Sequence, residues 1–251
     1  MEVFAARIGL TARGIVYILM GYLALLIARG GHVEVDQKSV LDQVLLKPQG
    51  SWLVGLLAFG FACYAFWRFY EALASKRANR TSGSRILSLL RGIAYAALSY
   101  TAFVVLRGSH QRQSTQQRDY AATIMSHQGG RWLIGAIGFT ILIVGIVNLR
   151  DGMRLKFMRH FQGRSLSRSV RQWIRQLGRI GTMARGFVFA ITGALVLSAA
   201  WTHNSAQATG IDGAVKSLRH QPFGELLLGI VACGLIIFGI YGLAEARYRD
   251  I

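Results

Sequence analysis

The chain has 251 residues, is 53% hydrophobic and only 16% charged, and carries a net charge of +18. Soluble domains average roughly 45–50% apolar and about 25% charged residues, so this composition argues against an ordinary soluble domain, and its apolar content argues against a disordered chain. Two cysteines cannot form a disulfide framework, and the excess of positive charge indicates a negatively charged partner, either nucleic acid or an anionic membrane surface.

Six apolar runs without charged residues predict six membrane-spanning helices. A spanning helix needs about 17–25 such residues, and the shorter runs reach that length because flanking arginines can extend to the interface. The first run also resembles a signal-peptide core, but no cleavage site follows it and its pattern returns later in the chain. The runs cover residues 14–28, 51–67, 92–106, 132–149, 186–202 and 226–244. We therefore predict an all-α polytopic membrane protein.

The connecting segments differ strongly in charge. The N-terminal tail, the segments 68–91 and 150–185 and the C-terminal tail hold 20 of the 29 lysines and arginines, whereas the three other loops hold nine. Lysine and arginine concentrate on the cytoplasmic side of membrane proteins, which predicts a bacterial inner-membrane protein with both termini in the cytoplasm. The basic residues then face anionic inner-leaflet lipids, and we expect no nucleic acid partner because no recognition module accompanies them.

The chain repeats itself three times. The first, third and fifth runs open on an arginine-glycine pair with an aromatic residue four positions after the arginine: Arg13-Gly14, Arg91-Gly92 and Arg185-Gly186. The other three runs carry a glycine followed sixteen residues later by an acid: Gly55 and Glu71, Gly135 and Asp151, Gly229 and Glu245. Such self-similarity predicts three tandem two-helix repeats in a pseudo-threefold bundle. The single membrane domain, 1–251, divides into repeats at about 7–75, 85–155 and 179–248, with a linker at about 160–179.

These repeated residues resemble a family of bacterial membrane proteins called domain of unknown function 1206. The segment His220-Gln221-Pro222-Phe223-Gly224, with Gly213-Ala214 before it, is most typical of that family. The middle repeat departs from the pattern, because it has His127-Gln128-Gly129-Gly130 and ends its second helix on aspartate. The resemblance covers residues 7–247 and implies a six-helix, three-repeat membrane protein, but it brings no activity with it.

The repeated arginines and acids are predicted to lie at one cytoplasmic level. An arginine at a helix N-terminus and an acid at a C-terminus both oppose the helix macrodipole, which favours pairing across helices. The pairs would be Arg13 with Glu71, Arg91 with Asp151 and Arg185 with Glu245, or the same partners shifted by one repeat around a ring. Such pairs would be structural clamps; the alternative is a cytoplasmic gate of breakable ion pairs, as in repeat-built carriers.

Small residues recur on the predicted helices and let apolar helices approach closely. The first helices of the repeats carry them seven residues apart, and the second helices ten residues apart, ending at Ala65, Gly145 and Gly239. The predicted packing residues are Gly14, Gly21, Gly55, Gly92, Gly135, Gly186, Gly193 and Gly229.

The linker is predicted to be a basic amphipathic helix. Its apolar residues Leu166, Val170, Ile174 and Leu177 recur at helical spacing. A basic helix with a tryptophan is expected to lie in the inner-leaflet interface, and packing against cytoplasmic loops is the alternative. The candidate lipid-binding residues are Arg164, Arg168, Arg171, Trp173, Arg175 and Arg179.

Five of the six histidines lie on the predicted outer side. His32, His110 and His203 stand 17 or 18 residues after the repeat glycines, and three imidazoles related by symmetry could bind a transition metal. They lack close spacing and an accompanying carboxylate, so we expect ordinary loop residues and no metal or other cofactor. No nucleophile–base pair is visible either, so we do not expect an enzyme.

The sequence thus predicts a non-enzymatic structural or interaction component of the bacterial inner membrane, whose partners are the lipid bilayer, anionic inner-leaflet lipids and another membrane protein. The alternative is a small-solute transporter or channel with a path along the pseudo-threefold axis. Such a path needs polar residues that face the axis. The polar groups available for it are Tyr17, Tyr64, Tyr95, Thr140 and Asn148.

Overall fold

The computed structural model describes residues 2–31, 35–46, 48–73, 82–108, 113–127, 129–161, 167–219 and 221–249, and all regular elements in these ranges are helical. The long helices are α1 (Glu2–Ala28), α3 (Gly50–Leu73), α4 (Ser82–Leu106), α6 (Gly130–Met153), α7 (Arg168–Thr202) and α9 (Gly224–Tyr248). The short ones are α2 (Gln37–Leu45), α5 (Gln113–Met125) and α8 (Gly210–Arg219), with 3₁₀ turns η1 (Lys156–Phe161) and η2 (Ser205–Gln207).

The six long helices are each long and apolar enough to cross a membrane, which confirms the six predicted spans. A short helix separates the two spanning helices of every repeat: α2 in the first, α5 in the second and α8 in the third. Each repeat is therefore a long–short–long unit.

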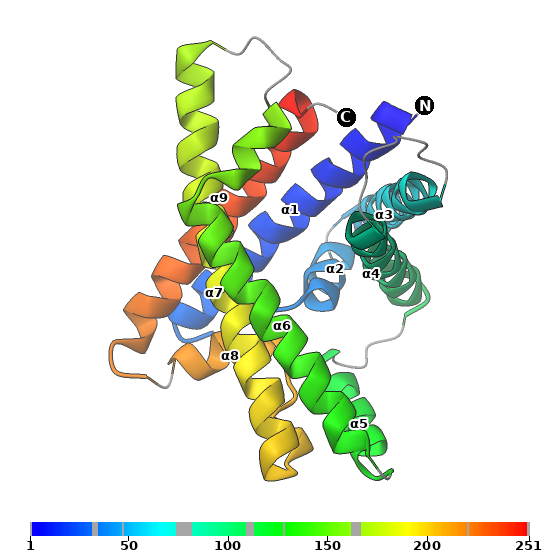
Figure 1. Cartoon of the computed structure of the whole chain (residues 1–251), viewed down its shortest axis with the longest axis vertical. Helices are drawn as coiled ribbons and strands as arrows, with labels where there is room; N and C mark the ends of the chain where they lie inside the picture. Colours follow the sequence, from blue (N-terminus) through cyan, green and yellow to red (C-terminus); the bar gives the residue numbers. More distant parts are fainter. Residues whose placement is uncertain are drawn as a thin grey trace.

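The second spanning helix of one repeat packs against the first spanning helix of the next. These pairs are α3 with α4 and α6 with α7, while α9 at the end of the chain returns to pack against α1 (Figure 1). The α1–α9 pair is central, because α1 also packs on α3 and α9 on α7. Accordingly, 56% and 50% of the span residues of α1 and α9 are buried, against 18% and 17% in α4 and α6.

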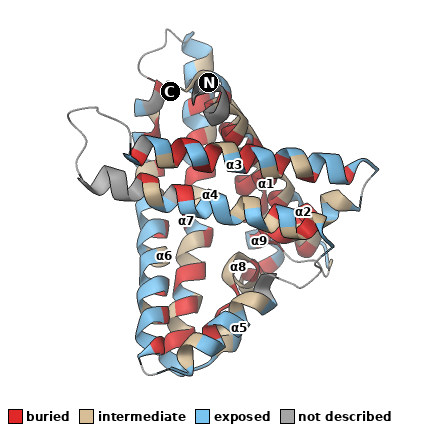
Figure 2. Ribbon diagram, turned by 90° about the vertical axis from the view of Figure 1, so that its right-hand side faces the viewer, coloured by how far each residue is buried: buried red, intermediate tan, exposed pale blue. Residues whose placement is uncertain are grey.

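The three helix pairs do not form a closed ring of equal interfaces. In Figure 2, α3 and α4 run horizontally while α6 and α7 run vertically, so these two helix pairs are strongly inclined to one another. In the described parts of α4 and α6, the two helices of the middle repeat, there is no interface comparable to α1–α3 or α7–α9. The three-repeat, six-helix architecture is thus observed, whereas its pseudo-threefold symmetry stays a prediction.

Glycines let the paired helices touch through their backbones. A Cβ atom on Gly14 would lie 2.8 Å from the carbonyl oxygen of Gly239, and Cβ atoms on Gly145 and Gly186 would each lie 2.9 Å from the other residue's carbonyl oxygen. Real Cβ contacts are not this short, so a side chain at these positions would push α1 from α9 and α6 from α7. This close approach is how apolar helices associate where no hydrophobic effect drives them together.

The same geometry places most of the other predicted packing glycines at interfaces. Gly21 faces α9, Gly193 faces α6, and Gly92 faces the ring of Phe69. The prediction was wrong for Gly55 and Gly229, where an added Cβ would meet nothing within 4 Å; Gly135 does face α7, since its added Cβ would lie 3.7 Å from the Cβ of Ala200. Gly55 and Gly229 stand near the helix starts, on faces that no neighbouring helix covers.

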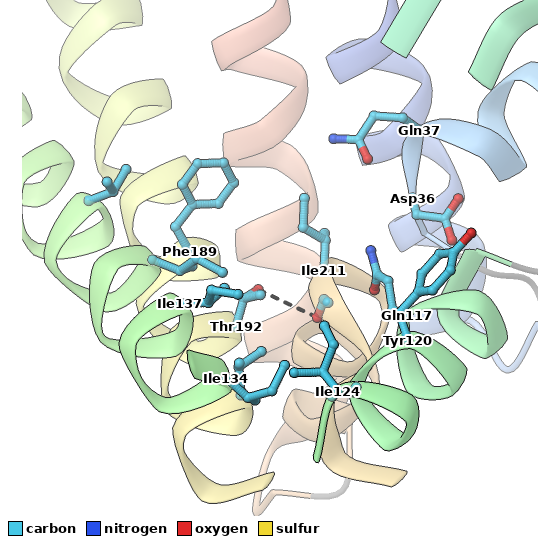
Figure 3. A pocket seen from close by; sticks show the side chains of 16 residues that line it. Asp36, Gln37, Gln117, Tyr120, Ile124, Ile134, Ile137, Phe189, Thr192 and Ile211 are labelled. Atoms are coloured by element: carbon cyan, nitrogen blue, oxygen red, sulfur yellow. Dashed lines mark hydrogen bonds between the residues drawn. The ribbon is translucent and has the colours of Figure 1, made fainter. Parts of the chain in front are cut away.

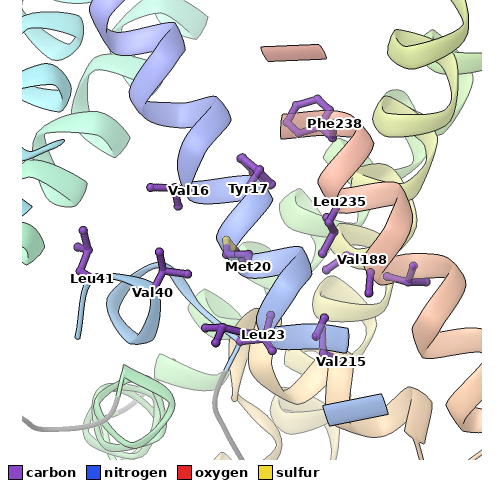
Figure 4. Packing of buried hydrophobic residues seen from close by; sticks show 14 of the residues in the cluster. Val16, Tyr17, Met20, Leu23, Val40, Leu41, Val188, Val215, Leu235 and Phe238 are labelled. Atoms are coloured by element: carbon purple, nitrogen blue, oxygen red, sulfur yellow. The ribbon is translucent and has the colours of Figure 1, made fainter. Parts of the chain in front are cut away.

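Buried apolar side chains from all three repeats meet around α1. Tyr17, Met20 and Leu23 of α1 lie near Leu235 and Phe238 of α9 (Figure 4). The short helices α2 and α8 add further side chains, so they close the end of the core that lies away from the termini. The added residues are Val40, Leu41 and Val215. The first and last repeats thus share one core.

The predicted separate linker helix is corrected by the structure. Residues from Arg168 onward already belong to α7, which continues without a break to Thr202. The turn η1 folds back and places Phe157 and Phe161 against the apolar face of this helix, where Ile174 is only 2% exposed. The apolar face of this helix is therefore described better by the alternative, in which it packs against a connecting segment. The turn η1 supplies enough aromatic surface to bury it.

The glycine contacts give a matched pair of substitutions. Gly186→Ala should lower the stability by roughly 1–3 kcal/mol, because the new methyl group overpacks the α6–α7 contact. Gly229→Ala should be neutral or stabilise the protein by up to about 1 kcal/mol, because alanine has the higher helix propensity. Thermal unfolding of the purified protein in detergent measures both. A Gly186→Ala protein that melts at or above the temperature of the Gly229→Ala protein would contradict the packing.

Candidate functional site

Charged and aromatic side chains meet where α1, α7 and α9 pack together inside the spanning segments. Arg13 comes from α1, Arg185 from α7 and Glu245 from α9. The two arginines are the repeat arginines of the first and third repeats, and the glutamate is the terminal acid of the third. Charges at this depth are costly unless they are paired, so each needs a partner.

Glu245 lies between two arginines. The Arg13 guanidinium donates through Nη2 to Glu245 Oε2, and Arg249 donates through Nη1 to Glu245 Oε1 at 3.4 Å. The side chains of Arg13 and Glu245 are 14% and 6% exposed, so this pair is largely removed from solvent. This pair joins the first repeat to the last. It corresponds to the second predicted pairing, in which each arginine pairs with the acid of a neighbouring repeat and not with that of its own repeat.

Arg185 is held differently. Its guanidinium carbon lies 4.8 Å from the ring centroid of Phe189, 5.1 Å from that of Phe238 and 5.6 Å from that of Tyr17. Within the described part of the chain it forms no ion pair, and its buried Nε has no hydrogen-bond partner. The expected pairing of Arg185 with Glu245 is therefore absent, because the Glu245 oxygens are occupied by Arg13 and Arg249. Three aromatic faces stabilise the Arg185 charge by cation–π attraction instead.

The middle repeat behaves differently again. Asp151 forms an ion pair with Lys156 on the neighbouring turn η1, with 3.0 Å between Oδ1 and Nζ, and both side chains are partly exposed. Its ion-pair partner in the described part of the chain is therefore a lysine of the neighbouring turn and not Arg185. The side chains of Glu71 and Arg91 lie outside the described residues, and so do the pairs predicted for them.

The structure adds an aromatic feature that the sequence analysis missed. Tyr17 packs edge-on against Phe238 with 4.7 Å between ring centroids, and Tyr64 packs in the same way against Tyr95 at 4.3 Å. The first pair joins the last repeat to the first, and the second pair joins the first repeat to the second. A sequence signal existed, since Tyr64 and Phe238 each stand nine residues after the repeat glycine of their own helix.

Arg68 was also missed. This arginine on α3 is only 4% exposed. It donates to the hydroxyl oxygen of Tyr64 at 2.6 Å through Nη2, and it stacks on Trp67 at 4.4 Å from the ring centroid. Tyr64 therefore packs against the Tyr95 ring and also accepts a hydrogen bond from the buried Arg68 guanidinium.

A second polar tie between the first and last repeats lies at the opposite end of the bundle. Asp212 of α8 is 3% exposed and accepts from the backbone N–H of Val35 at 3.0 Å and from Lys216 Nζ at 2.8 Å. Nothing in the sequence distinguished this aspartate from a solvated loop residue. Two polar ties, one at each end, thus join the first repeat to the last.

In the described part of the chain, no cluster of three potential metal ligands occurs. His203 lies 2.7 Å from Arg131 Nη1 through its Nε2. His32 and His110, the other two members of the predicted triad, fall outside the described residues.

The lipid-binding candidates line a basic hollow. Arg168, Arg171, Arg175 and Arg179 surround a cavity of about 690 Å³ together with Leu155 and Met158. Trp173 on the same stretch of helix is 64% exposed, so its ring is available to an interface. Arg164 lies outside the described residues.

The Arg13–Glu245 contact predicts a large difference between two acids at the same repeat position. Glu245→Ala leaves Arg13 buried without its partner, which costs about 3–5 kcal/mol for a buried pair. Asp151→Ala breaks a partly exposed pair worth about 0–1 kcal/mol. Melting in detergent should therefore fall far more for Glu245→Ala, and the exchanged pair Arg13→Glu with Glu245→Arg should recover part of the loss. Equal losses for the two acids would contradict the clamp.

The comparisons with known proteins agree with this repeat architecture. The profile of the family described as Domain of Unknown Function (DUF1206) matches three times, at residues 8–75, 88–154 and 180–249. The chain is also 28% identical over 249 residues to the "Uncharacterized protein YxxB" of Bacillus subtilis (strain 168), which covers 98% of this chain and 90% of that protein. No solved structure matches significantly. The chain therefore belongs to the DUF1206 family, as three tandem copies of its domain.

Proposed function

We propose that this protein is a non-enzymatic structural or interaction component of the bacterial inner membrane. The main support for this proposal is that the described buried charges hold helices together. Glu245 joins Arg13 to Arg249, and Arg185 is enclosed by aromatic rings. These groups tie one helix pair to another, as clamps do, and leave the close glycine contacts undisturbed.

The positions of the tyrosines favour a structural role over a solute path. Tyr17, Tyr64 and Tyr95 were three of the five polar groups on which a path could have depended, and all three pack in ring pairs. Thr140 bonds back to the carbonyl oxygen of Ala136 in its own helix. This arrangement gives a solute few polar groups to follow through the bundle.

The proposed orientation places both termini in the cytoplasm. The termini and the connection between α6 and α7 lie at the same end of the molecule (Figure 1). In the sequence, the N-terminal tail, the segment 150–185 and the C-terminal tail hold 14 lysines and arginines, against nine in the three loops that connect the two spanning helices of each repeat. At the opposite end, exposed tryptophans mark the start of α6 and the end of α7: Trp132 and Trp201, with 73% and 89% exposure. Tryptophans at one level are typical of a membrane interface.

The proposed interaction partners at the cytoplasmic end are anionic lipids. The hollow beside Arg171 and Arg175 combines several guanidinium groups with the apolar side chains of Leu155 and Met158. Basic pockets on the cytoplasmic side of spanning helices suit anionic headgroups, and apolar neighbours suit the chains below them. Exposed apolar side chains on α3 and α6, such as Phe66 and Phe139, offer further surface to lipid or to a protein partner.

A flux experiment distinguishes a clamp from a gate. The unmodified protein and the Arg185→Ala variant are reconstituted into vesicles, and the release of trapped potassium and of a small anionic dye is followed. We expect a lower melting temperature for Arg185→Ala, because its cation–π contacts are lost, and no release beyond that of protein-free vesicles. A variant that keeps its melting temperature but releases either solute would favour the transporter alternative.

Reporter fusions test the orientation separately. Alkaline phosphatase is active only in the periplasm, so it should be inactive when fused after Arg249 and active when inserted near Ser205. A fluorescent protein fused to the C-terminus should be bright. Phosphatase activity at the C-terminus would contradict the proposed topology.

A further inference from the structure

Two spanning helices carry the same notch at equivalent positions of their repeats. On each helix, a glycine stands three residues after an exposed tryptophan and four residues before an exposed phenylalanine. These residues are Trp52, Gly55 and Phe59 on α3, and Trp132, Gly135 and Phe139 on α6. Spacings of three and four place the side chains on one face of a helix, so each glycine leaves a gap between two aromatic rings.

The structure has a hollow at both notches. The hollow on α3 has a volume of about 460 Å³, and the hollow on α6 has a volume of about 610 Å³. An added Cβ on Gly55 would meet nothing within 4 Å, and one on Gly135 would meet only the Cβ of Ala200 at 3.7 Å. Both glycines therefore leave open space beside their helices. Since the same three residues give a hollow in two repeats, the hollow follows from their pattern.

The hollow on α6 is a groove, because α7 supplies a second wall. Leu197, Ala200 and Trp201 of α7 line it together with the residues of α6. Gly135 and Ala200 approach each other across the helix pair. The larger side chains of both helices, Trp132 and Trp201 among them, stand beside this small pair and line the same space, which we call the α6–α7 groove.

Polarity in the α6–α7 groove changes along the spanning helices. Arg131 is the second residue of α6, whereas Phe139 stands eight residues further on, about 12 Å along the helix. On α7, Trp201 stands next to the last residue and Leu197 lies one turn deeper. The guanidinium thus belongs to the end of the helices and the apolar lining to their interior. The hydrocarbon of one leaflet is about 15 Å deep, so the groove accommodates most of one acyl chain.

The largely apolar cavity between α5, α6, α7 and α8 differs in this respect. It has a volume of about 440 Å³, and Ile137 of α6 faces Gln117 and Tyr120 of α5 across the bundle (Figure 3). Its polar and apolar sides are therefore not separated along the spanning helices. A lipid needs that separation, because its headgroup and its chains lie at different depths of the membrane. The α6–α7 groove provides it.

Arg131 gives the α6–α7 groove a positive charge that no carboxylate neutralises in the described part of the chain. Its Nη1 lies 2.7 Å from Nε2 of His203, and its guanidinium carbon lies 5.2 Å from the ring centroid of Trp132. Arginine can only donate, so Nε2 accepts and the imidazole is neutral. His203 therefore positions the guanidinium without cancelling its charge. A cation at a helix N-terminus also opposes the macrodipole, and a bound anion offsets this cost.

We propose that the α6–α7 groove binds a phospholipid, with one acyl chain along the groove over Gly135 and the phosphate on Arg131. A guanidinium has five donors, so Arg131 can serve His203 and still donate to phosphate oxygens in charge-assisted hydrogen bonds. This site goes beyond the structural role proposed above. It is separate from the basic hollow at the other end of α7, and it does not depend on which end of the molecule faces the cytoplasm.

Photolabelling of the purified, delipidated full chain in detergent tests the proposal. The probe is a phosphatidic acid with a diazirine in one acyl chain, and it should give a saturable label on the peptides that contain Gly135 and Ala200. Unlabelled dioleoyl phosphatidic acid should compete at a concentration about tenfold lower than dioleoylglycerol, because a hydrogen bond to a charged group is worth about one power of ten in affinity. The two competitors differ only in the phosphate.

The repeat glycines provide a matched pair of substitutions. Gly135→Leu fills the groove. Gly229→Leu adds the same side chain at the equivalent position of the third repeat, where an added Cβ would meet nothing within 4 Å and where Leu226 and Cys233 replace the two aromatic residues. We expect a loss of at least about tenfold in the saturable label for the first and no change for the second, since only the first removes contacts with the chain. Equal labelling of the two variants would overturn the site.

A further variant tests the headgroup without filling the groove. Arg131→Gln removes the positive charge, so the preference for dioleoyl phosphatidic acid over dioleoylglycerol should fall by about tenfold. Arg118→Gln removes an exposed arginine of α5 that does not line the groove, and it should leave the preference unchanged. An unchanged preference in Arg131→Gln, or equal competition in the unmodified protein, would overturn the assignment of the phosphate. Neither result bears on the flux or fusion experiments, so the structural role stands or falls separately.

Discussion

The contact between α1 and α9 is the constraint on which the rest of the structure depends. Gly14 and Gly239 bring the first and last spanning helices to backbone distance, and Arg13 and Glu245 join them across the same interface. The two helices are the most buried spans of the chain, and the other two helix pairs pack against them through α3 and α7. A tandem array of repeats has two free ends, and this contact removes both of them.

The surroundings of the repeat arginines in the first and third repeats show how such a charge can be buried. Arg13 has a carboxylate and Arg185 has three aromatic rings, two of which belong to α1 and α9. The ring of Phe238 serves both arginines, at 5.5 Å from Arg13 and 5.1 Å from Arg185. A single carboxylate thus suffices for this interface, because the aromatic faces stabilise the second cation without adding a further charge.

The sequence predicts the parts of this structure that depend on local pattern. The six spans follow from uncharged apolar runs, and the repeats follow from Arg-Gly pairs at fixed spacing. Partner choice was not predictable, because the pairing of Arg13 with Glu71 or with Glu245 depends on which helices are neighbours in space. The linker was misjudged because Ile174 and Leu177 fit the periodicity of a separate amphipathic helix and of a continuous α7 equally well. Gly55 and Gly229 were misjudged because repetition shows that a glycine recurs but not which way it faces.

The departure from threefold packing and the apolar cavity share one cause. In a closed ring, α4 would pack on α6 as α1 packs on α3, and its side chains would cover the wall that holds Ile137. Instead α5 packs on α6, η2 and α8, and a helix of 13 residues covers less of α6 than a spanning helix would. The uncovered part of the wall is apolar and lies within a span, while its cover brings Gln117 and Tyr120 to one side. A cavity with an apolar wall and a polar edge therefore forms where a short helix, and not a long one, covers α6.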